Sequence, residues 1–341
     1  MLYRSKAPLR IGLAGGGTDV SPYCDEFGGA ILNATISLYA YANIELIAEN
    51  KIIIEAKDRN EIQTFEWATN LPINGSLDLL KGVYNRVQKD YGIPQKGFKL
   101  STYVDAPAGS GLGTSSTLVV AILGAFVEML KLPLGDYDIA HYAYEIERQD
   151  LKLAGGRQDQ YAATFGGVNF MEFYENDKVI VNPLRIRQEY LNELENNLVL
   201  FFTATSRESA TIIKEQQKNI SGKNIESIQA THLLKEQAKM MKETLLKGKL
   251  NPIGEILDYG FQQKRKMAAN ISNSLIEEIY KTAKNAGATG GKISGAGGGG
   301  FMIFYCPATT RYNVINALEK FGGLVKQYRF SSEGLTSWTA L

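Results

Sequence analysis

The spacing of apolar and polar residues in the first half of the chain predicts a β-rich opening followed by alternating helices and strands. Short apolar or alternating runs, which are typical of strands, occupy residues 9–14, 30–37, 39–48, 51–56, 64–67 and 97–103. Helical spacing is found at residues 77–91, 115–130 and 136–150. A short helix at 158–165 precedes a hairpin formed by residues 168–173 and 178–181.

A polar and irregular stretch at residues 182–197 leads into the second half, and we expect the domain boundary there. Strand patterns follow at residues 198–204, 301–306 and 324–330. Helical patterns occupy residues 206–219, 227–247, 252–271, 274–286 and 309–321. This succession predicts an α+β fold with two domains, residues 1–185 and 186–341, and a length of 341 residues agrees with two domains.

Composition argues against several classes of partner. The chain has 37 basic and 36 acidic residues, and this balance argues against a nucleic-acid partner. The longest uncharged apolar run, residues 118–127, is too short to span a membrane, and no apolar leader follows Met1. Cys24 and Cys306 lack the spacing of metal ligands, so we expect two reduced thiols in a cytoplasmic protein.

The segment Ala106–Ser116 combines three glycines at alternate positions with three consecutive hydroxyl residues before an apolar helix. Glycines let the backbone approach a ligand, and the unpaired N–H groups at a helix N-terminus attract phosphate. No Gly-Lys-Ser/Thr closes the loop, so backbone amides and a metal would have to replace the lysine of a P-loop. The alternative is a turn that only caps the helix. We expect nucleotide phosphates to contact Pro107, Gly109, Ser110, Gly111, Leu112, Gly113, Thr114, Ser115 and Ser116.

A magnesium ion in a phosphoryl-transfer site needs hard oxygen ligands. Ser115 or Ser116 is placed to supply one at the start of the helix. The helix at 136–150 offers a carboxylate in Glu145 or Glu147. The alternative is that both glutamates lie on the solvent-exposed side of an amphipathic helix.

Two aspartates follow glycine-rich breaks. Asp159 comes after Gly155-Gly156 at an expected helix start, where amides and the helix dipole would keep it ionised. Asp19 follows the glycines at 15–17, where its carboxylate can accept two hydrogen bonds from sugar hydroxyls. The alternative for both is a role in capping the next turn.

A third glycine-rich block covers residues 290–300 and contains G-x-G-x-x-G at Gly295, Gly297 and Gly300. A dinucleotide-binding turn opens a helix, whereas this block opens the apolar run FMIFYC, which is typical of a strand. We therefore reject a nicotinamide-dependent oxidoreductase. A glycine loop that lines a shared site is the better interpretation.

The three blocks, in this order, resemble the motifs of the GHMP kinase superfamily, which includes galactokinases and mevalonate kinases. Residues 6–19 are similar to its first motif, 106–116 to its second and 292–301 to its third. The resemblance implies the two-domain GHMP kinase architecture. An N-terminal ATP-binding domain like ribosomal protein S5 domain 2 would be followed by a ferredoxin-like C-terminal domain.

The resemblance also implies ATP and Mg²⁺ as cofactors, and roles for single residues. Asp159 matches the catalytic aspartate and Arg10 the basic residue beside it. Ser115 and Glu147 match the metal ligands, and Glu145 remains the alternative carboxylate. The residues that match the substrate-binding positions are Gly15, Gly16, Gly17, Thr18, Asp19, Gly156, Gly297 and Gly298.

Residues 13–29 and 154–167 resemble the D-glycero-D-manno-heptose 7-phosphate kinases within the superfamily, whereas galactokinases carry Glu-His in place of Gly16-Gly17. The expected reaction phosphorylates the anomeric hydroxyl of that sugar phosphate, giving the 1,7-bisphosphate for nucleotide-activated heptose and surface polysaccharide (capsule, LPS or S-layer). Candidate partners of the substrate's own phosphate are Lys292, Arg157 and Arg207. The alternatives are a kinase for L-fucose or galactose and a non-catalytic sensor of sugar and ATP. A homodimer is left open.

Overall fold

The structure, a computed structural model, describes residues 1–205 and 209–340. Strands of its larger, eight-stranded sheet run in the order β12-β1-β2-β5-β3-β4, with β6 on β2 and β7 on β6. These strands are β1 (Leu2–Ala14), β2 (Gly29–Leu46), β3 (Lys51–Ala56), β4 (Glu61–Glu66), β5 (Phe98–Val104), β6 (Val168–Phe173), β7 (Val179–Pro183) and β12 (Thr336–Ala340). Among the described strands of this sheet, only β3 and β5 pair in parallel. Alternating burial along β3 (Ile52, Ile54 and Ala56 inward) shows one apolar face of this sheet.

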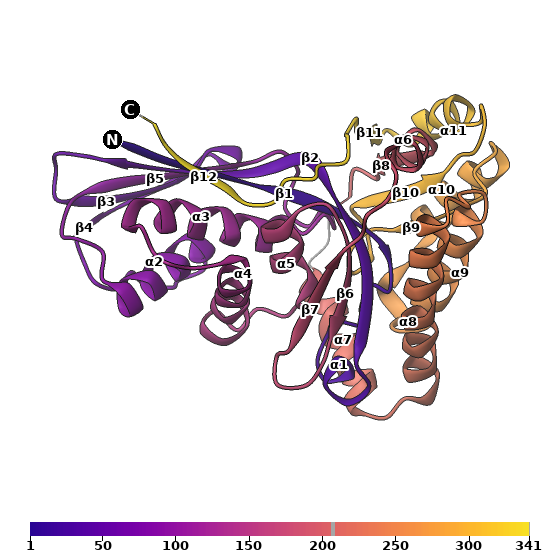
Figure 1. The fold of residues 1–341 in the computed structure, drawn as a ribbon, viewed down its shortest axis with the longest axis horizontal. Coiled ribbons are helices and arrows are strands. Elements are labelled where there is room, and N and C mark those ends of the chain that lie inside the picture. Colours follow the sequence, from indigo (N-terminus) through magenta and orange to yellow (C-terminus); the bar gives the residue numbers. More distant parts are fainter. Residues whose placement is uncertain (206–208, 341) are drawn as a thin grey trace.

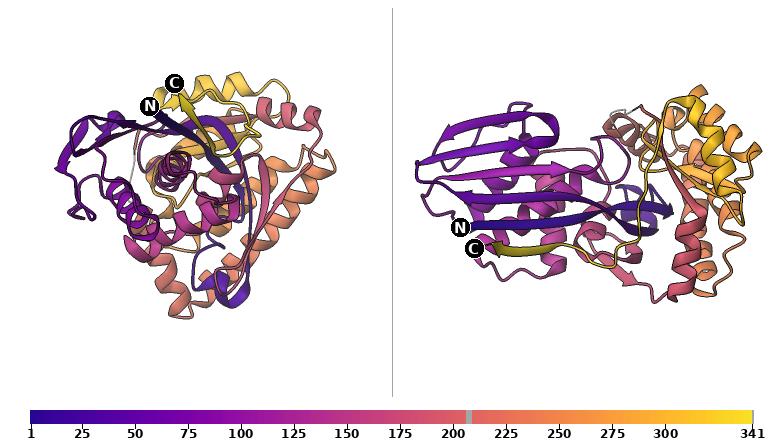
Figure 2. Two further views of the ribbon diagram at one scale, coloured as in Figure 1. Left: turned by 60° about the vertical axis from the view of Figure 1, so that its left-hand side comes forward. Right: turned by 90° about the horizontal axis from the view of Figure 1, so that it is seen from above.

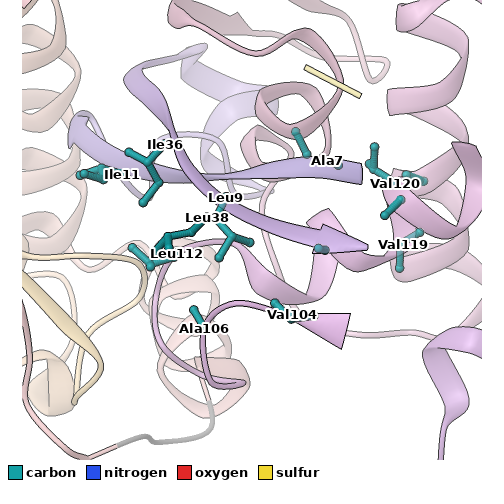
Figure 3. Packing of buried hydrophobic residues seen from close by; sticks show 14 of the residues in the cluster. Ala7, Leu9, Ile11, Ile36, Leu38, Val104, Ala106, Leu112, Val119 and Val120 are labelled. Atoms are coloured by element: carbon teal, nitrogen blue, oxygen red, sulfur yellow. The ribbon is translucent and has the colours of Figure 1, made fainter. Parts of the chain in front are cut away.

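Helices cover that apolar face (Figure 1). They are α2 (Asp78–Tyr91), α3 (Thr114–Leu130), α4 (Asp136–Glu145) and α5 (Gln158–Phe165), with a π-helical turn, η2 (Ile146–Asp150), after α4. Helix α3 packs against β1 and β2 and is buried along most of its length, because its sequence is apolar on nearly every side. In Figure 3, the labelled Leu112 lies with Leu9 of β1 and Leu38 of β2 in one apolar cluster. The loop before α3 is therefore anchored in the core.

A second sheet of four antiparallel strands has the order β11-β8-β10-β9. Its strands are β8 (Leu198–Phe202), β9 (Gly290–Ile293), β10 (Phe301–Tyr305) and β11 (Leu324–Val325). Numbered along the chain, this is the order 4-1-3-2 of a ferredoxin-like sheet. The remaining helices are α1 (Tyr23–Phe27), α6 (Gln188–Asn197), α7 (Ser209–Ser221), α8 (Ile225–Leu246), α9 (Ile253–Arg265), α10 (Ser274–Asn285) and α11 (Arg311–Leu318), with 3₁₀ turns at Lys57–Arg59, Ala269–Ile271 and Glu319–Phe321. The predicted α+β class and ferredoxin-like C-terminal part are confirmed.

Several predicted boundaries were wrong. The strands predicted at 30–37 and 39–48 form one long strand, β2, and the irregular stretch 182–197 contains α6. The prediction also missed the first part of β1, which begins at Leu2. Ser5 and Ala7 face inward there next to charged residues, and this alternation is too weak to recognise in the sequence. Strand β9 lies inside the glycine block, and the predicted last strand at 324–330 is only two residues long.

The chain ends in a strand that the sequence did not predict. Strand β12 pairs with β1 over Leu2–Lys6, and the two termini lie side by side (Figures 1 and 2). Residues 336–340, which we had expected in the second domain, therefore belong to the larger sheet. The division at 185/186 otherwise stays a prediction. Within the described residues, no helix is long and apolar enough to cross a membrane.

Candidate active site

A cavity of about 520 Å³ lies where the three glycine-rich blocks meet. The loop before α3, the turn after β1 and the start of α5 contribute to its wall, as do four residues of α7 and single residues of α9 and β9. Its polar and charged lining side chains are Arg10, Asp19, Thr114, Ser115, Ser116, Glu147, Arg148, Gln158, Asp159, Ser209, Gln216, Lys264 and Lys292.

The glycine-rich loop presents its backbone to this cavity. Gly109, Gly111 and Gly113 have φ values of 72°, 83° and 78°, so the loop depends on glycine at alternate positions. Helix α3 begins at Thr114 with no side-chain cap, which leaves the N–H groups of its first turn available to an anion. Ser110 O accepts a hydrogen bond from Phe301 N at 2.8 Å, so the third glycine block braces the loop.

The predicted phosphate-binding residues divide into two groups. Gly109, Gly111 and the run 113–116 line the cavity. Leu112 instead points into the core, and Ser110 is fully buried beside the third block. Within the described residues, Pro107, Ser110 and Leu112 are not part of the lining, so they shape the loop rather than face the cavity.

Arg10 and Asp159 form an ion pair in the cavity wall. Nε of Arg10, on β1, donates to Oδ1 of Asp159, in the first turn of α5, at 2.7 Å. Its Nη1 atom donates to Gly111 O at 2.5 Å, so one guanidinium joins the carboxylate to the glycine-rich loop. A Cβ at Gly113 would lie 3.2 Å from Cγ of Asp159, which shows how closely loop and carboxylate approach. The structure thus brings together the two predicted catalytic residues.

Ser115 and Glu147 meet at the other side of the loop. Ser115 Oγ donates to Oε1 of Glu147 at 3.2 Å, and Gln160 Nε2 donates to Oε2 of the same carboxylate. Glu147 is 1% exposed and lies on η2, where the change from α- to π-helix turns its side chain inward. Glu145, the alternative, instead pairs with Arg86 at 2.6 Å, and among the described residues it is not part of the cavity lining.

Asp19 is a buried carboxylate that faces Asp159. Its Oδ2 accepts hydrogen bonds from the backbone N–H groups of Arg157 at 3.0 Å and Gln158 at 3.1 Å. Burial raises the pKa of Asp19, and the neighbouring Asp159 raises it further. Gly156 is required beside it, because a Cβ there would lie 1.9 Å from Oδ2. The side chain of Asp19 is therefore held at the cavity wall by the loop before α5.

The other predicted substrate-binding residues are placed less uniformly. Gly16, Gly17 and Gly156 line the cavity. The N–H of Gly15 donates a hydrogen bond to Oε1 of Gln237, and the hydroxyl of Thr18 exchanges hydrogen bonds with the backbone of Ala30. Both residues therefore stabilise the turn and do not line the cavity. Gly297 and Gly298 pack against Ile271 and are not among the cavity-lining residues of the described chain. Gly295 and Ala296 of the same block line the cavity instead.

Of the candidate cations for a substrate phosphate, Lys292 lines the cavity and Arg157 does not. The guanidinium of Arg157 pairs with Asp25 at 2.7 Å and Asp177 at 2.9 Å, so it is used in holding the structure. Arg207 lies outside the described residues. The sequence analysis did not identify Lys264 or Gln216 of α7, and both line the cavity.

Comparisons with known proteins agree with this geometry. Models of the GHMP kinase N-terminal and C-terminal domains match residues 78–167 and 241–324. A D-glycero-alpha-D-manno-heptose 7-phosphate kinase of Campylobacter jejuni is 49% identical over 98% of both chains. The crystal structure of a D-glycero-D-manno-heptose 1-phosphate kinase from Bacteroides thetaiotaomicron superposes with a TM-score of 0.85, at 46% identity and 99% coverage of both chains.

A galactokinase of Lactococcus lactis, in complex with galactose, shares the fold at a TM-score of 0.77 over 98% of this chain and 95% of that one, but only 18% of the sequence. That likeness extends to the fold alone. The first relative, by contrast, matches along nearly the whole chain at an identity that shows common family membership. This protein is a kinase of the GHMP family, and as such it uses ATP.

Proposed function

We propose that this kinase phosphorylates the anomeric hydroxyl of D-glycero-D-manno-heptose 7-phosphate. The observation that carries the proposal is the Arg10–Asp159 pair in a cavity that also holds Asp19, in a chain 49% identical to a kinase of that name. In the proposed reaction, the anomeric oxygen forms a bond to the γ-phosphorus of ATP as the bond between that phosphorus and the β,γ-bridging oxygen breaks. ADP leaves, and Asp159 accepts the proton of the hydroxyl.

The residues of the site would act mainly by positioning and by electrostatics. Asp159 orients the hydroxyl, and the proton transfer can come late because the transition state of phosphoryl transfer is loose. Arg10 contacts both Asp159 and Gly111 O, so its charge lies between the acceptor and the phosphate loop. The amides at the start of α3 would hold the nucleotide phosphates. Asp19 would accept hydrogen bonds from sugar hydroxyls.

The donor set at Ser115 and Glu147 fits a magnesium ion. A hydroxyl and a buried carboxylate, 3.2 Å apart at the cavity wall, are hard oxygen ligands of the kind that Mg²⁺ prefers. Magnesium bound there would neutralise charge on the nucleotide phosphates. We therefore assign Ser115 and Glu147, rather than Glu145, as the protein ligands.

The names of the two relatives differ in the position of the substrate phosphate, C7 in one and C1 in the other. The test is to incubate the purified protein with Mg-ATP and each of heptose, heptose 7-phosphate, heptose 1-phosphate, L-fucose and galactose. ADP release identifies the substrate, and ³¹P NMR shows which carbon receives phosphate. We expect a 1,7-bisphosphate from heptose 7-phosphate. A product only from L-fucose or galactose, or no turnover at all, contradicts the proposal.

In the proposed role, the product would supply nucleotide-activated heptose for a surface polysaccharide, in the cytoplasm and with only small molecules as partners. The name of the 49% identical relative supports the substrate of this route. A homodimer stays a prediction, and light scattering on the eluting protein measures it.

A further inference from the structure

Two lysines in the cavity wall have no part in the mechanism above. Lys264, the residue before the last of α9, is 2% exposed, and Lys292 of β9 is 4% exposed. Nζ of Lys264 donates to Gly16 O at 3.1 Å, and Nζ of Lys292 donates to Gly12 O at 2.8 Å. Within the described residues neither lysine has a carboxylate within salt-bridge distance.

A buried ammonium group without a counter-ion is unfavourable for folding. Burial lowers the pKa of Lys264 to about 8, with Arg10 adding to the effect and Asp19 opposing it. Burial, with Lys264 and Arg10 nearby, lowers the pKa of Lys292 well below its usual value. Lys264 and Lys292 are thus two buried amino groups side by side, each of which is harder to protonate than a lysine in water. Such an arrangement is explained if a ligand supplies the missing negative charge.

The position of Lys264 places the negative charge of such a ligand on the side of the cavity that would hold the sugar. The carbonyl that it contacts belongs to Gly16, in the turn between β1 and Asp19. Asp19, three residues after Gly16, lines the same cavity and is the carboxylate that we propose contacts the sugar. Within the described residues, neither lysine donates a hydrogen bond to the phosphate loop. An anion at Lys264 would therefore belong to the sugar and not to the nucleotide.

Glycines keep this end of the cavity open. A Cβ at Gly16 would lie 3.5 Å from Nζ of Lys264, in the space that a ligand would need. Gly17 also lines the cavity, but a Cβ there would lie 2.8 Å from Cε of Met267 and 3.5 Å from Oε1 of Gln216, so this glycine is required by close packing. Gln216 is 3% exposed, and its Nε2 has no hydrogen-bond acceptor among the described residues. That nitrogen is itself buried from solvent, so the donors that line the cavity here are the amino groups of Lys264 and Lys292.

We propose that Lys264, assisted by Lys292, binds the phosphate group that the sugar substrate already carries. The site makes a phosphorylated sugar, rather than a free sugar, the preferred substrate class. This inference rests on the proposed function and names the residues that recognise one end of its substrate.

The test compares Lys264→Met with Lys266→Met, an exposed lysine two residues further on that does not line the cavity. For each protein, kcat/KM is measured on heptose 7-phosphate and on heptose. We expect Lys264→Met to lose about 30-fold of the preference for the phosphorylated sugar, mainly through KM, because a buried charged contact is removed. Lys264→Arg should recover part of it, and Lys266→Met should match the wild type. Equal losses of Lys264→Met on both sugars would overturn the inference.

A binding measurement separates this inference from the proposed function. Saturating Mg-ADP occupies the nucleotide site, and inorganic phosphate is then added while the unfolding temperature is followed. Phosphate should raise it in the wild type and in Lys266→Met but not in Lys264→Met, whose buried methionine removes an unpaired charge and is compatible with folding. If the wild type shows no phosphate response, the inference is wrong whatever sugar the kinase uses. If the response is present but heptose 7-phosphate is not a substrate, only the proposed function fails.

Discussion

Oγ of Ser115 lies 3.2 Å from Oε1 of Glu147, although 32 positions separate these residues in the chain. The contact joins the first turn of α3 to the π-helical turn η2. A regular α-helix through residues 136–150 would give Glu147 a different direction from the one that it has on η2. The π-turn therefore places one carboxylate at the phosphate loop and leaves Glu145 with Arg86.

Glu147→Gln should raise the Mg²⁺ concentration needed for half-maximal activity by about 10- to 100-fold, because an amide is a weaker ligand than a carboxylate. Glu145→Gln is the matched control, since its side chain pairs with Arg86 outside the cavity. Titration of activity with Mg²⁺ at saturating ATP and sugar measures both variants. A shift in Glu145→Gln with none in Glu147→Gln would reverse the assignment.

Asp159→Asn should keep the fold and the binding of ATP while kcat falls by about 10³-fold, since the amide can accept a hydrogen bond but not the proton of the hydroxyl. Steady-state kinetics measure kcat, and calorimetric titration with a non-hydrolysable ATP analogue measures nucleotide binding. Asp58→Asn, an exposed carboxylate in the 3₁₀ turn after β3, serves as the control. Turnover close to that of the wild type in Asp159→Asn would exclude this role.

Gly156→Ala should damage sugar binding and leave nucleotide binding intact. The new Cβ would lie 1.9 Å from Oδ2 of Asp19, so the carboxylate or the loop before α5 must move. A displacement of that size at a positioned group lowers kcat/KM for the sugar by about 100-fold. Gly135→Ala, at an exposed position where the nearest atom to a new Cβ is 3.5 Å away, should have little effect. An unchanged KM for the sugar in Gly156→Ala would show that Asp19 does not contact it.

The sequence was sufficient to predict those site residues that stand in short, recognisable motifs. Arg10, Asp159 and the loop 106–116 stand in short motifs of glycine and polar residues, and the structure brings all three together. From the residue pattern alone, the metal-binding carboxylate could be assigned only to Glu145 or Glu147, because helical periodicity does not reveal a π-turn. Its inward direction depends on that turn.

Other features depend on contacts that no local pattern contains. Strand β12 is short and polar, and its partner β1 lies more than 300 residues earlier. Lys264 belongs to a run of three basic residues, which predicts an exposed helix end. The packing of α9 against β1 and β9 buries Lys264, while Lys266 stays exposed. The burial of Lys264 in the cavity wall therefore becomes visible only in the folded chain.

The KM for heptose 7-phosphate should depend on pH through Lys264. The substrate phosphate is almost fully ionised above pH 7, so the protonation of the protein decides the effect. Because the pKa of Lys264 is lowered to about 8 in the free enzyme, the charged form is abundant below that pH and is lost above it. The other charged groups that act on Lys264 are Asp19 and Arg10, and Lys264 acts in turn on Lys292; burial raises the pKa of Asp19 and lowers that of Lys292.

KM should accordingly be constant near pH 7 and rise by up to about tenfold per pH unit above pH 8. Lys264→Arg, whose guanidinium stays charged, should give a flat profile over pH 7–9.5. Heptose without a phosphate should show no such rise on the wild-type enzyme. A wild-type profile as flat as that of Lys264→Arg, or a rise of equal size with the unphosphorylated sugar, would mean that the charge of Lys264 does not act on the substrate phosphate.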